Sequence, residues 1–194
     1  TPFPNLPAID GVRLRVARAG YKNWGRCDLT FAELAPGTAV AGVTTQSKCP
    51  SPEVEWCRAA LTLGSARALI VNAGNANCVT GEQGVETDRR MAEIAAHELN
   101  LEALSVLTAS TGVIGVQLPI EKLEVSIPLA RVALEGDVTS AATAIMTTDL
   151  TMKVAEVTLS GGARVVGFCK GSGMIHPNMA TMLGFIATDA VLEP

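Results

Sequence analysis

The sequence has 194 residues, of which 48% are hydrophobic, and its 15 basic and 19 acidic residues leave a net charge of −4. A chain of this length and composition has enough apolar side chain to bury a core, which excludes an intrinsically disordered protein. Its charges form no block of one sign, which argues against a nucleic acid or an acidic membrane surface as the partner.

The cysteines and the apolar stretches indicate a cytoplasmic protein. Five scattered cysteines, odd in number and without a CxxC pair, favour reduced thiols over a disulfide framework. Two histidines, His97 and His176, are too few for a metal cluster. No stretch approaches the roughly 20 apolar residues that span a bilayer, and the start, Thr1-Pro2-Phe3-Pro4, does not resemble a signal peptide. We therefore expect neither a metal nor a membrane anchor.

The first predicted elements are strands. Apolar and arginine side chains alternate over residues 12–16, which is the period of a half-exposed strand. A second strand includes Leu29 and Phe31. It is followed by Pro and Gly at the centre of residues 35–38, which suits a type II turn, and residues 39–45 then predict a returning strand. The sequence thus predicts a β-hairpin here.

A capped helix follows the predicted hairpin. Ser51 is a suitable N-cap residue, Pro52 suits the first helical turn, and Glu53 and Glu55 place negative charge at the positive end of the helix. We expect Gly64 to end this helix.

An amide-rich segment comes after the next predicted strand, which spans residues 66–71. Residues 72–77, Asn-Ala-Gly-Asn-Ala-Asn, have two readings. They are either a loop that binds a polar ligand or a turn whose asparagines bond their own backbone, and the general behaviour of Asn favours the second. A helix over residues 82–99 follows, with an apolar stripe and His97 on its polar side.

A Ser-Thr-Gly segment follows the strand predicted over residues 105–109. Residues 110–112 are either an ordinary turn or, because a strand end can aim amides and a hydroxyl at a developing oxyanion, part of a catalytic site. From the residues alone the turn is favoured. The next helix is expected to open at Pro119.

The C-terminal third predicts a helix and a second hairpin. Residues 139–146 are rich in alanine and lead to Thr147-Thr148-Asp149, which by itself reads as a polar helix end. Residues 151–159 and 163–169 are β-like runs joined across Ser-Gly-Gly, a suitable tight turn. This hairpin ends at Lys170, which by itself reads as a solvated lysine at a strand end.

A glycine-broken loop then runs into an apolar segment at Thr181. Gly171 and Gly173 permit close backbone approach, Pro177 fixes the chain direction, and the apolar residues from 181 to 186 fit a strand buried on both faces. We interpret Thr181 as a buried nucleophile and His176 as a loop residue rather than its base.

Four motifs carry a resemblance to a known family. The stretch that begins Lys-Gly-Ser-Gly-Met at Lys170 and continues to Met-Ala-Thr-Met-Leu at residues 179–183 resembles the signature of the ornithine acetyltransferases, the glutamate N-acetyltransferases of arginine biosynthesis. Residues 72–77, 110–115 and 144–149 also match. The resemblance covers essentially the whole chain but only the N-terminal half of a typical precursor.

The resemblance implies a role for each matching residue. The precursor cuts itself between Ala180 and Thr181, and the freed α-amine of Thr181 becomes the base for its own hydroxyl. Thr111 and Gly112 form the oxyanion hole, which reverses the preference for a turn. Thr148 and Lys170 bind substrate, as does Thr181 itself.

The resemblance also implies a fold, a reaction and partners. The fold class is α/β (mixed α+β), a layered sandwich of β-sheets flanked by helices, with residues 1–194 as a single domain. An acetyl group passes from N-acetylornithine to glutamate through an acetyl-threonine intermediate, without a cofactor; acetyl-CoA stays open as a co-substrate. The partner is the C-terminal chain of the same precursor, in a heterotetramer of two chains of each kind.

Two other functions compete with this interpretation. A self-cleaving aminopeptidase or amidase shares the nucleophile and passes the acyl group to water instead. A non-catalytic binding subunit would use the Gly and Asn loops to hold a small ligand, and it would not need Thr181.

Overall fold

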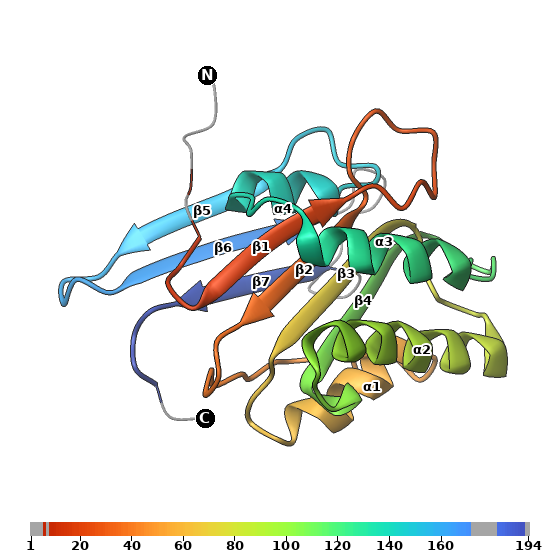
Figure 1. Cartoon of the computed structure of the whole chain (residues 1–194), viewed down its shortest axis with the longest axis horizontal. Helices are drawn as coiled ribbons and strands as arrows, with labels where there is room; N and C mark the ends of the chain where they lie inside the picture. Colours follow the sequence, from red (N-terminus) through yellow and green to blue (C-terminus); the bar gives the residue numbers. More distant parts are fainter. Residues whose placement is uncertain (1–5, 7, 172–181, 193–194) are drawn as a thin grey trace.

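The computed structural model describes residues 6, 8–171 and 182–192. Figure 1 shows strands and helices that alternate in the middle of the chain, from β2 to α3, with strands alone at both ends. Their bounds are β1 Val12–Ala17, β2 Leu29–Leu34, α1 Pro52–Leu61, β3 Ala68–Asn75, α2 Gly81–Leu99, β4 Val106–Val113, α3 Ile120–Val132, α4 Val138–Ala144, β5 Lys153–Thr158, β6 Arg164–Lys170 and β7 Leu183–Thr188. A short 3-10 helix at Ala103–Ser105 precedes β4.

Two separate sheets organise these elements. The first has the strand order β1-β2-β3-β4, in which β3 and β4 are parallel and the other pairs are antiparallel. The second is antiparallel with the order β5-β6-β7. Because β3 and β4 are parallel neighbours, their C-terminal ends reach the same side of the molecule.

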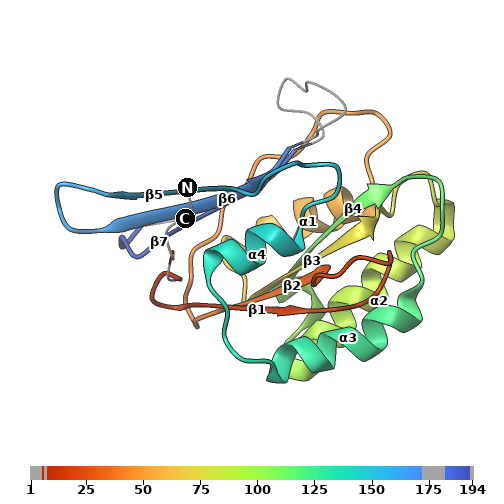
Figure 2. The ribbon, with the colours of Figure 1, turned by 90° about the horizontal axis from the view of Figure 1, so that it is seen from above.

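The sheets and helices form layers. In Figure 2, α4 lies between the two sheets, whereas α2 and α3 lie on the opposite face of the first sheet. Strand β2 is buried on both faces, because Leu29 and Phe31 join the core beneath α2 and α3 while Ala32 joins the core around α4. The predicted α/β (mixed α+β) sandwich of sheets flanked by helices is confirmed.

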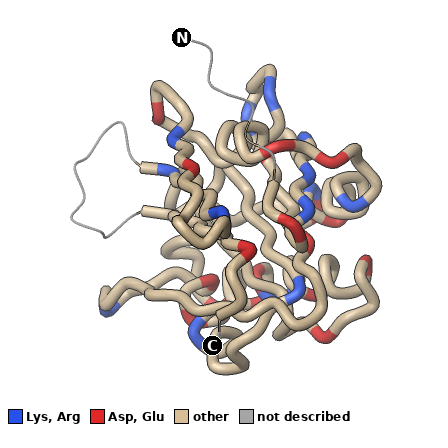
Figure 3. Tube along the Cα trace, turned by 90° about the vertical axis from the view of Figure 1, so that its left-hand side faces the viewer, with Lys and Arg blue, Asp and Glu red and all other residues tan. Residues whose placement is uncertain are grey.

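Charged residues do not gather on one side of the traced chain. Figure 3 shows basic and acidic positions interspersed along the described segments in its view. Among the described residues, no helix combines the length and the apolar character that a membrane span requires.

Three predicted elements are present as the sequence indicates. Helix α1 has Ser51 at its N-cap position and Pro52 in its first turn, although the Ser51 hydroxyl makes no capping hydrogen bond. Helix α2 carries an exposed His97. Strands β5 and β6 form the second hairpin, whose turn is closed by a 2.9 Å hydrogen bond from the Gly162 amide to the Leu159 carbonyl.

The first predicted hairpin is wrong. The turn at residues 35–38 does form, with a 3.2 Å hydrogen bond from the Thr38 amide to the Ala35 carbonyl and Gly37 at φ 82°. Residues 39–45 do not return along β2, however, and only Ala39 makes an isolated bridge, to Ser65. Both edges of β2 are already paired, one with β1 and the other with β3, so that no edge is left for a third strand.

The prediction of a doubly buried strand after residue 181 is also wrong. Strand β7 lies at an edge of the second sheet, and the Ile186 side chain is 80% exposed. Phe185 packs on the core around α4, with its ring 5.1 Å from that of Phe168. In the described part of the chain, only one face of this sheet is covered.

Candidate functional site

The first part of the candidate site is the shared end of β3 and β4. Their parallel register places Ala73 beside Thr111 and Gly74 beside Gly112. The sequence predicted loops at residues 72–77 and 110–112, but β3 continues to Asn75 and β4 to Val113, and this is a correction. Pairing between β3 and β4 supplies partners for part of the backbone of these segments, which removes the reason for a turn.

Gly112 occupies a position that only glycine fits. Its φ is 137°, and a Cβ there would lie 2.4 Å from the Gly74 carbonyl carbon and 2.6 Å from the Asn75 nitrogen. Gly112 is exposed and Thr111 is half-buried. The two predicted oxyanion residues thus lie next to each other at an accessible strand end, held by a close backbone approach.

The asparagines of the amide-rich segment bond backbone groups. The Asn72 Nδ2 donates to the Asn75 carbonyl at 2.9 Å, and the Asn77 Nδ2 donates to the Gly84 carbonyl at 2.8 Å. The Asn75 Nδ2 donates to the Gln117 carbonyl at 3.2 Å. All three residues are buried. Their side chains bond backbone carbonyls, as the second reading expected, but in a strand end rather than a turn and mostly on other segments.

The second part of the site is Lys170 at the end of β6. Lys170 is 8% exposed, its Nζ donates to the Gly171 carbonyl at 2.8 Å, and the same atom lies 3.8 Å from the Asp149 Oδ2. The alternative of a solvated lysine is therefore wrong. Burial lowers the pKa of Lys170, whereas the Asp149 carboxylate acts to raise it.

Asp149 joins the candidate site through its contacts with Lys170 and Gly171, and the sequence did not single it out. Its Oδ1 accepts hydrogen bonds from the Lys153 Nζ at 2.5 Å and from the Gly171 amide at 3.1 Å, and its Oδ2 accepts one from the Thr147 amide at 3.4 Å. Burial alone would raise the pKa of Asp149, but these hydrogen bonds and the charge of Lys170 outweigh burial, and the pKa lies below 3.8. The signal in the sequence was a lysine four residues after an aspartate in a matching motif.

Asp149 ties the segment after α4 to the strand that carries Lys170. Thr148 is exposed and lies between Thr147 and Asp149. The Asp149 carboxylate accepts a hydrogen bond from the backbone amide of Thr147. Thr148 is thus adjacent in the chain to the carboxylate that pairs with Lys170.

The loop between β1 and β2 connects the two parts of the site. The Arg26 guanidinium donates to the Thr143 carbonyl at 3.0 Å and to the Met146 carbonyl at 2.5 Å, which covers the C-terminal end of α4. It also stacks 4.1 Å above the Trp24 ring, and the Trp24 ring in turn lies against Gly74. Contacts thus run from Gly112 through Gly74 and this loop to the segment before Asp149.

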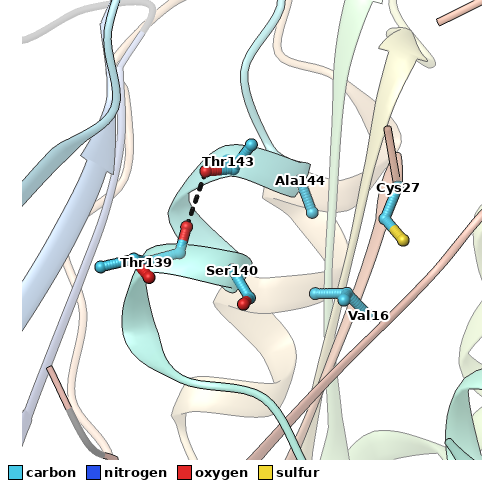
Figure 4. A pocket seen from close by; sticks show the side chains of 6 residues that line it. All are labelled: Val16, Cys27, Thr139, Ser140, Thr143 and Ala144. Carbon is cyan, nitrogen blue, oxygen red and sulfur yellow. Dashed lines mark hydrogen bonds between the residues drawn. The ribbon is translucent and has the colours of Figure 1, made fainter. Parts of the chain in front are cut away.

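A shallow pocket lies beside this loop but contains no predicted site residue. Figure 4 shows its lining, which consists of Val16, Cys27, Thr139, Ser140, Thr143 and Ala144. Its hydroxyls are already engaged: the Thr143 Oγ1 donates to the Thr139 carbonyl, and the Ser140 Oγ donates to the Asp137 carboxylate. This pocket is therefore not part of the candidate site.

Ala180 and Thr181, the predicted cleavage site and nucleophile, lie outside the described residues, as does His176. The ranges 8–171 and 182–192 hold no group of three or more His, Cys, Asp and Glu side chains placed to bind a metal.

A buried carboxyl of α2 lies behind β4. Asp88 is 1% exposed, and burial is the main cause that raises its pKa to about 7, opposed in part by the Thr108 hydroxyl. A carboxyl with a raised pKa destabilises the folded state once it ionises. Stability should therefore fall as the pH rises from about 4 to 7.

Replacing Asp88 with Asn should remove this loss. We expect Asp88→Asn to raise the free energy of unfolding by roughly 2–4 kcal/mol at pH 8 and to leave it unchanged at pH 4. Urea unfolding at the two pH values measures both. Glu82→Gln, an exposed site on the same helix, is the control and should change stability by less than about 0.5 kcal/mol at either pH. Equal effects of Asp88→Asn at both pH values would contradict the prediction.

Comparison with known proteins identifies the family. A family model described as the ArgJ family matches residues 13–194. The chain belongs to this family. It is 51% identical to an arginine biosynthesis bifunctional protein ArgJ of Zymomonas mobilis, over 98% of this chain and 47% of that protein. It is also 51% identical to the protein of the same name from Thermus thermophilus, over 94% of this chain and 47% of that one. The chain thus spans about half the length of the curated relatives it matches.

Solved structures of the family share the fold. An ornithine acetyltransferase from Mycobacterium tuberculosis, complexed with ornithine, matches with a TM-score of 0.81 and 33% identity over 92% of this chain and 96% of that chain. ArgJ from Bacillus halodurans matches with a TM-score of 0.79 and 28% identity, over 93% and 95%. The resemblance to ornithine acetyltransferases noted in the motifs is confirmed.

Proposed function

We propose that this chain is the N-terminal half of a self-cleaving ornithine acetyltransferase, which moves an acetyl group from N-acetylornithine to glutamate in arginine biosynthesis. The observation that carries the proposal is the accessible Thr111-Gly112 strand end, connected to a buried Lys170-Asp149 pair, in a chain of the ArgJ family. The ornithine in the Mycobacterium tuberculosis structure supports an amino acid as the substrate class.

Self-cleavage would create the base for the reaction. The Thr181 hydroxyl oxygen attacks the Ala180 carbonyl carbon, and the peptide C–N bond breaks as the hydroxyl proton passes to the departing nitrogen, which frees the α-amine. Water then hydrolyses the resulting ester to the Ala180 carboxyl and the Thr181 hydroxyl. An α-amine has a pKa near 8 and can take the hydroxyl proton at neutral pH.

Turnover would then proceed in two half-reactions. The Thr181 oxygen attacks the acetyl carbonyl of N-acetylornithine, its proton passes through the α-amine to the leaving nitrogen, and ornithine departs. The glutamate amine next attacks the acetyl-threonine ester and restores the hydroxyl. The Thr111 hydroxyl and the Gly112 amide donate hydrogen bonds to the oxyanion in each step. This sequence predicts ping-pong kinetics.

Lys170 and Thr148 would hold the substrate. The Lys170 ammonium is suited to a substrate carboxylate, because Asp149 fixes it in place and opposes the loss of its charge on burial. Thr148, next to Asp149, adds an exposed polar group at the same place.

The chain lengths support a two-chain protein. This chain covers 47% of the Zymomonas mobilis relative but 96% of the chain in the Mycobacterium tuberculosis structure. We propose that a C-terminal chain from the same precursor completes the pocket, in a heterotetramer. The five free thiols agree with a cytoplasmic location. No cofactor is proposed, and acetyl-CoA is the candidate second donor, since the relatives are named as bifunctional.

Thr181→Ala should abolish both cleavage and transfer. Denaturing mass spectrometry of the wild-type precursor should show a fragment that ends at Ala180, and the variant should stay uncut and lose more than about a thousand-fold in acetyl transfer. Thr151→Ala, at an exposed threonine, is the control and should behave like the wild type.

The identity of the acyl acceptor and the occurrence of self-cleavage distinguish the competing functions. Hydrolysis of amino-acid amides without transfer to glutamate would favour the aminopeptidase. A wild-type chain that stays uncut in the presence of its C-terminal part would remove the free amine and favour the binding subunit.

A further inference from the structure

Glu53 is a buried carboxyl that the proposed mechanism does not use. It lies in the first turn of α1 and is 4% exposed. Both of its carboxyl oxygens are buried, and neither has a hydrogen-bond partner among the described residues. A buried carboxylate without a partner is strongly unfavourable, so this group needs an explanation.

Helix α1 packs along β4. The Trp56 Nε1 donates to the Val106 carbonyl at 2.8 Å, and the Cys57 Sγ donates to the Thr108 carbonyl at 3.2 Å. Glu53 precedes Cys57 by one helical turn, and the Ser110 side chain on β4 is one of the groups close enough to its carboxyl to act on it.

Ser110 can only accept a hydrogen bond from Glu53. Its hydroxyl hydrogen is directed to the Asn72 Oδ1 at 2.6 Å, and the oxygen of that amide has no hydrogen to return. The Ser110 oxygen can therefore act only as a hydrogen-bond acceptor toward any other group. A group that bonds to this oxygen must carry a hydrogen, which for Glu53 means the neutral carboxylic acid.

The hydrogen-bond chain from Ser110 ends at the backbone beside Gly112. The Asn72 Nδ2 donates to the Asn75 carbonyl at 2.9 Å. The Asn75 nitrogen is one of the atoms that a Cβ on Gly112 would meet, at 2.6 Å. Ser110 also lies two residues before Gly112 on the same strand, so its position fixes the strand end directly.

The surroundings of Glu53 favour the neutral form. Burial raises its pKa, and the neighbouring Ser51 and Asn77 side chains lower it only in part. The other titratable groups near it are Asp88, Cys57 and Cys78, none of which becomes positively charged.

We propose that Glu53 is a positioning residue that acts as a neutral acid: its carboxyl O–H donates to Ser110, and the chain through Asn72 to Asn75 holds the strand end that presents the Gly112 amide. The inference rests on the proposed role of Gly112 in the oxyanion hole.

Two substitutions at Glu53 in the full-length protein test this role. Glu53→Ala should lower kcat for acetyl transfer about 30- to 100-fold with KM within about threefold, because the oxyanion donor moves while substrate binding does not. Glu53→Gln keeps a neutral donor and should restore kcat to within about threefold of the wild type. Glu55→Ala, exposed on the same helix, is the matched control.

The pH profile and a double-mutant cycle separate positioning from general stability. The wild-type kcat should decline at alkaline pH as Glu53 ionises, and this decline should be absent from Glu53→Gln. Ser110→Ala should lower kcat to a similar extent as Glu53→Ala, and the double variant should be little worse than either. If Glu53→Ala does not fold, the pH profiles of the wild type and Glu53→Gln still test the proposal.

Each result decides the inference. A kcat for Glu53→Ala equal to that of the wild type, a Glu53→Gln variant as impaired as Glu53→Ala, or additive losses with Ser110→Ala would overturn it. Hydrogen exchange of the backbone amides at residues 110–113 provides a readout apart from activity, and we expect faster exchange in Glu53→Ala only. A wild-type protein without transferase activity would overturn the proposed function and with it the positioning role of Glu53. Amide exchange would still show whether the hydrogen-bond chain from Glu53 to Asn75 stabilises the strand end.

Discussion

Gly112→Ala is expected to lower the free energy of unfolding by roughly 3 kcal/mol or more and acetyl transfer by at least about a hundred-fold. The added Cβ would lie 2.4 Å from the Gly74 carbonyl carbon, so β3 and β4 must move apart. The same φ of 137° is strained for any residue with a Cβ. Since the Gly112 amide is the proposed oxyanion donor, the displacement acts where the chemistry occurs.

Gly115→Ala separates the clash from the backbone strain. Gly115 also has a positive φ, 75°, but a Cβ there would meet no atom within 4 Å. We expect this control to lose about 1 kcal/mol of stability and to keep most of its activity. Urea unfolding and the acetyl-transfer assay are the measurements. Equal losses for the two variants would show that the close approach of Gly112 to β3 has no special role.

Asp149→Asn should give the second largest effect. The amide has nearly the same shape but leaves the buried Lys170 ammonium without its negative partner, and it weakens the hydrogen bond from Lys153. We expect a loss of roughly 2–4 kcal/mol in the free energy of unfolding at pH 7. If Lys170 binds a substrate carboxylate, KM should rise more than kcat falls, because the ammonium is displaced rather than the nucleophile.

The pH dependence and a variant of Lys153 test this explanation. The pKa of Asp149 is held below 3.8, so the carboxylate stabilises the fold above that pH, and the gap between wild type and Asp149→Asn should close as the pH falls below it. Lys153→Met removes the more exposed cation and should lower stability by less than about 1 kcal/mol. A gap that persists at low pH would mean that shape, and not charge, explains the loss.

Local patterns along the chain were sufficient to predict most elements. The alternation over residues 12–16 predicts a strand, and Ser51 and Pro52 predict the start of α1. Both patterns depend on neighbours within a few positions, and both elements are present. The same local rule failed at residues 72–75 and 110–113, because Asn, Ser and Gly favour turns only while their backbone groups lack other partners. A parallel ladder supplied those partners.

The sequence by itself determined the family, the mixed α/β class and the candidate residues Thr111, Gly112, Thr148 and Lys170. Only the tertiary structure decided that β2 has no free edge for a hairpin, that Lys170 is buried against Asp149, and that Ser110 bonds Asn72, 38 positions away. Strand pairing and burial arise from contacts between distant residues, whose energy depends on which surfaces meet. That information is absent from any short stretch of the chain.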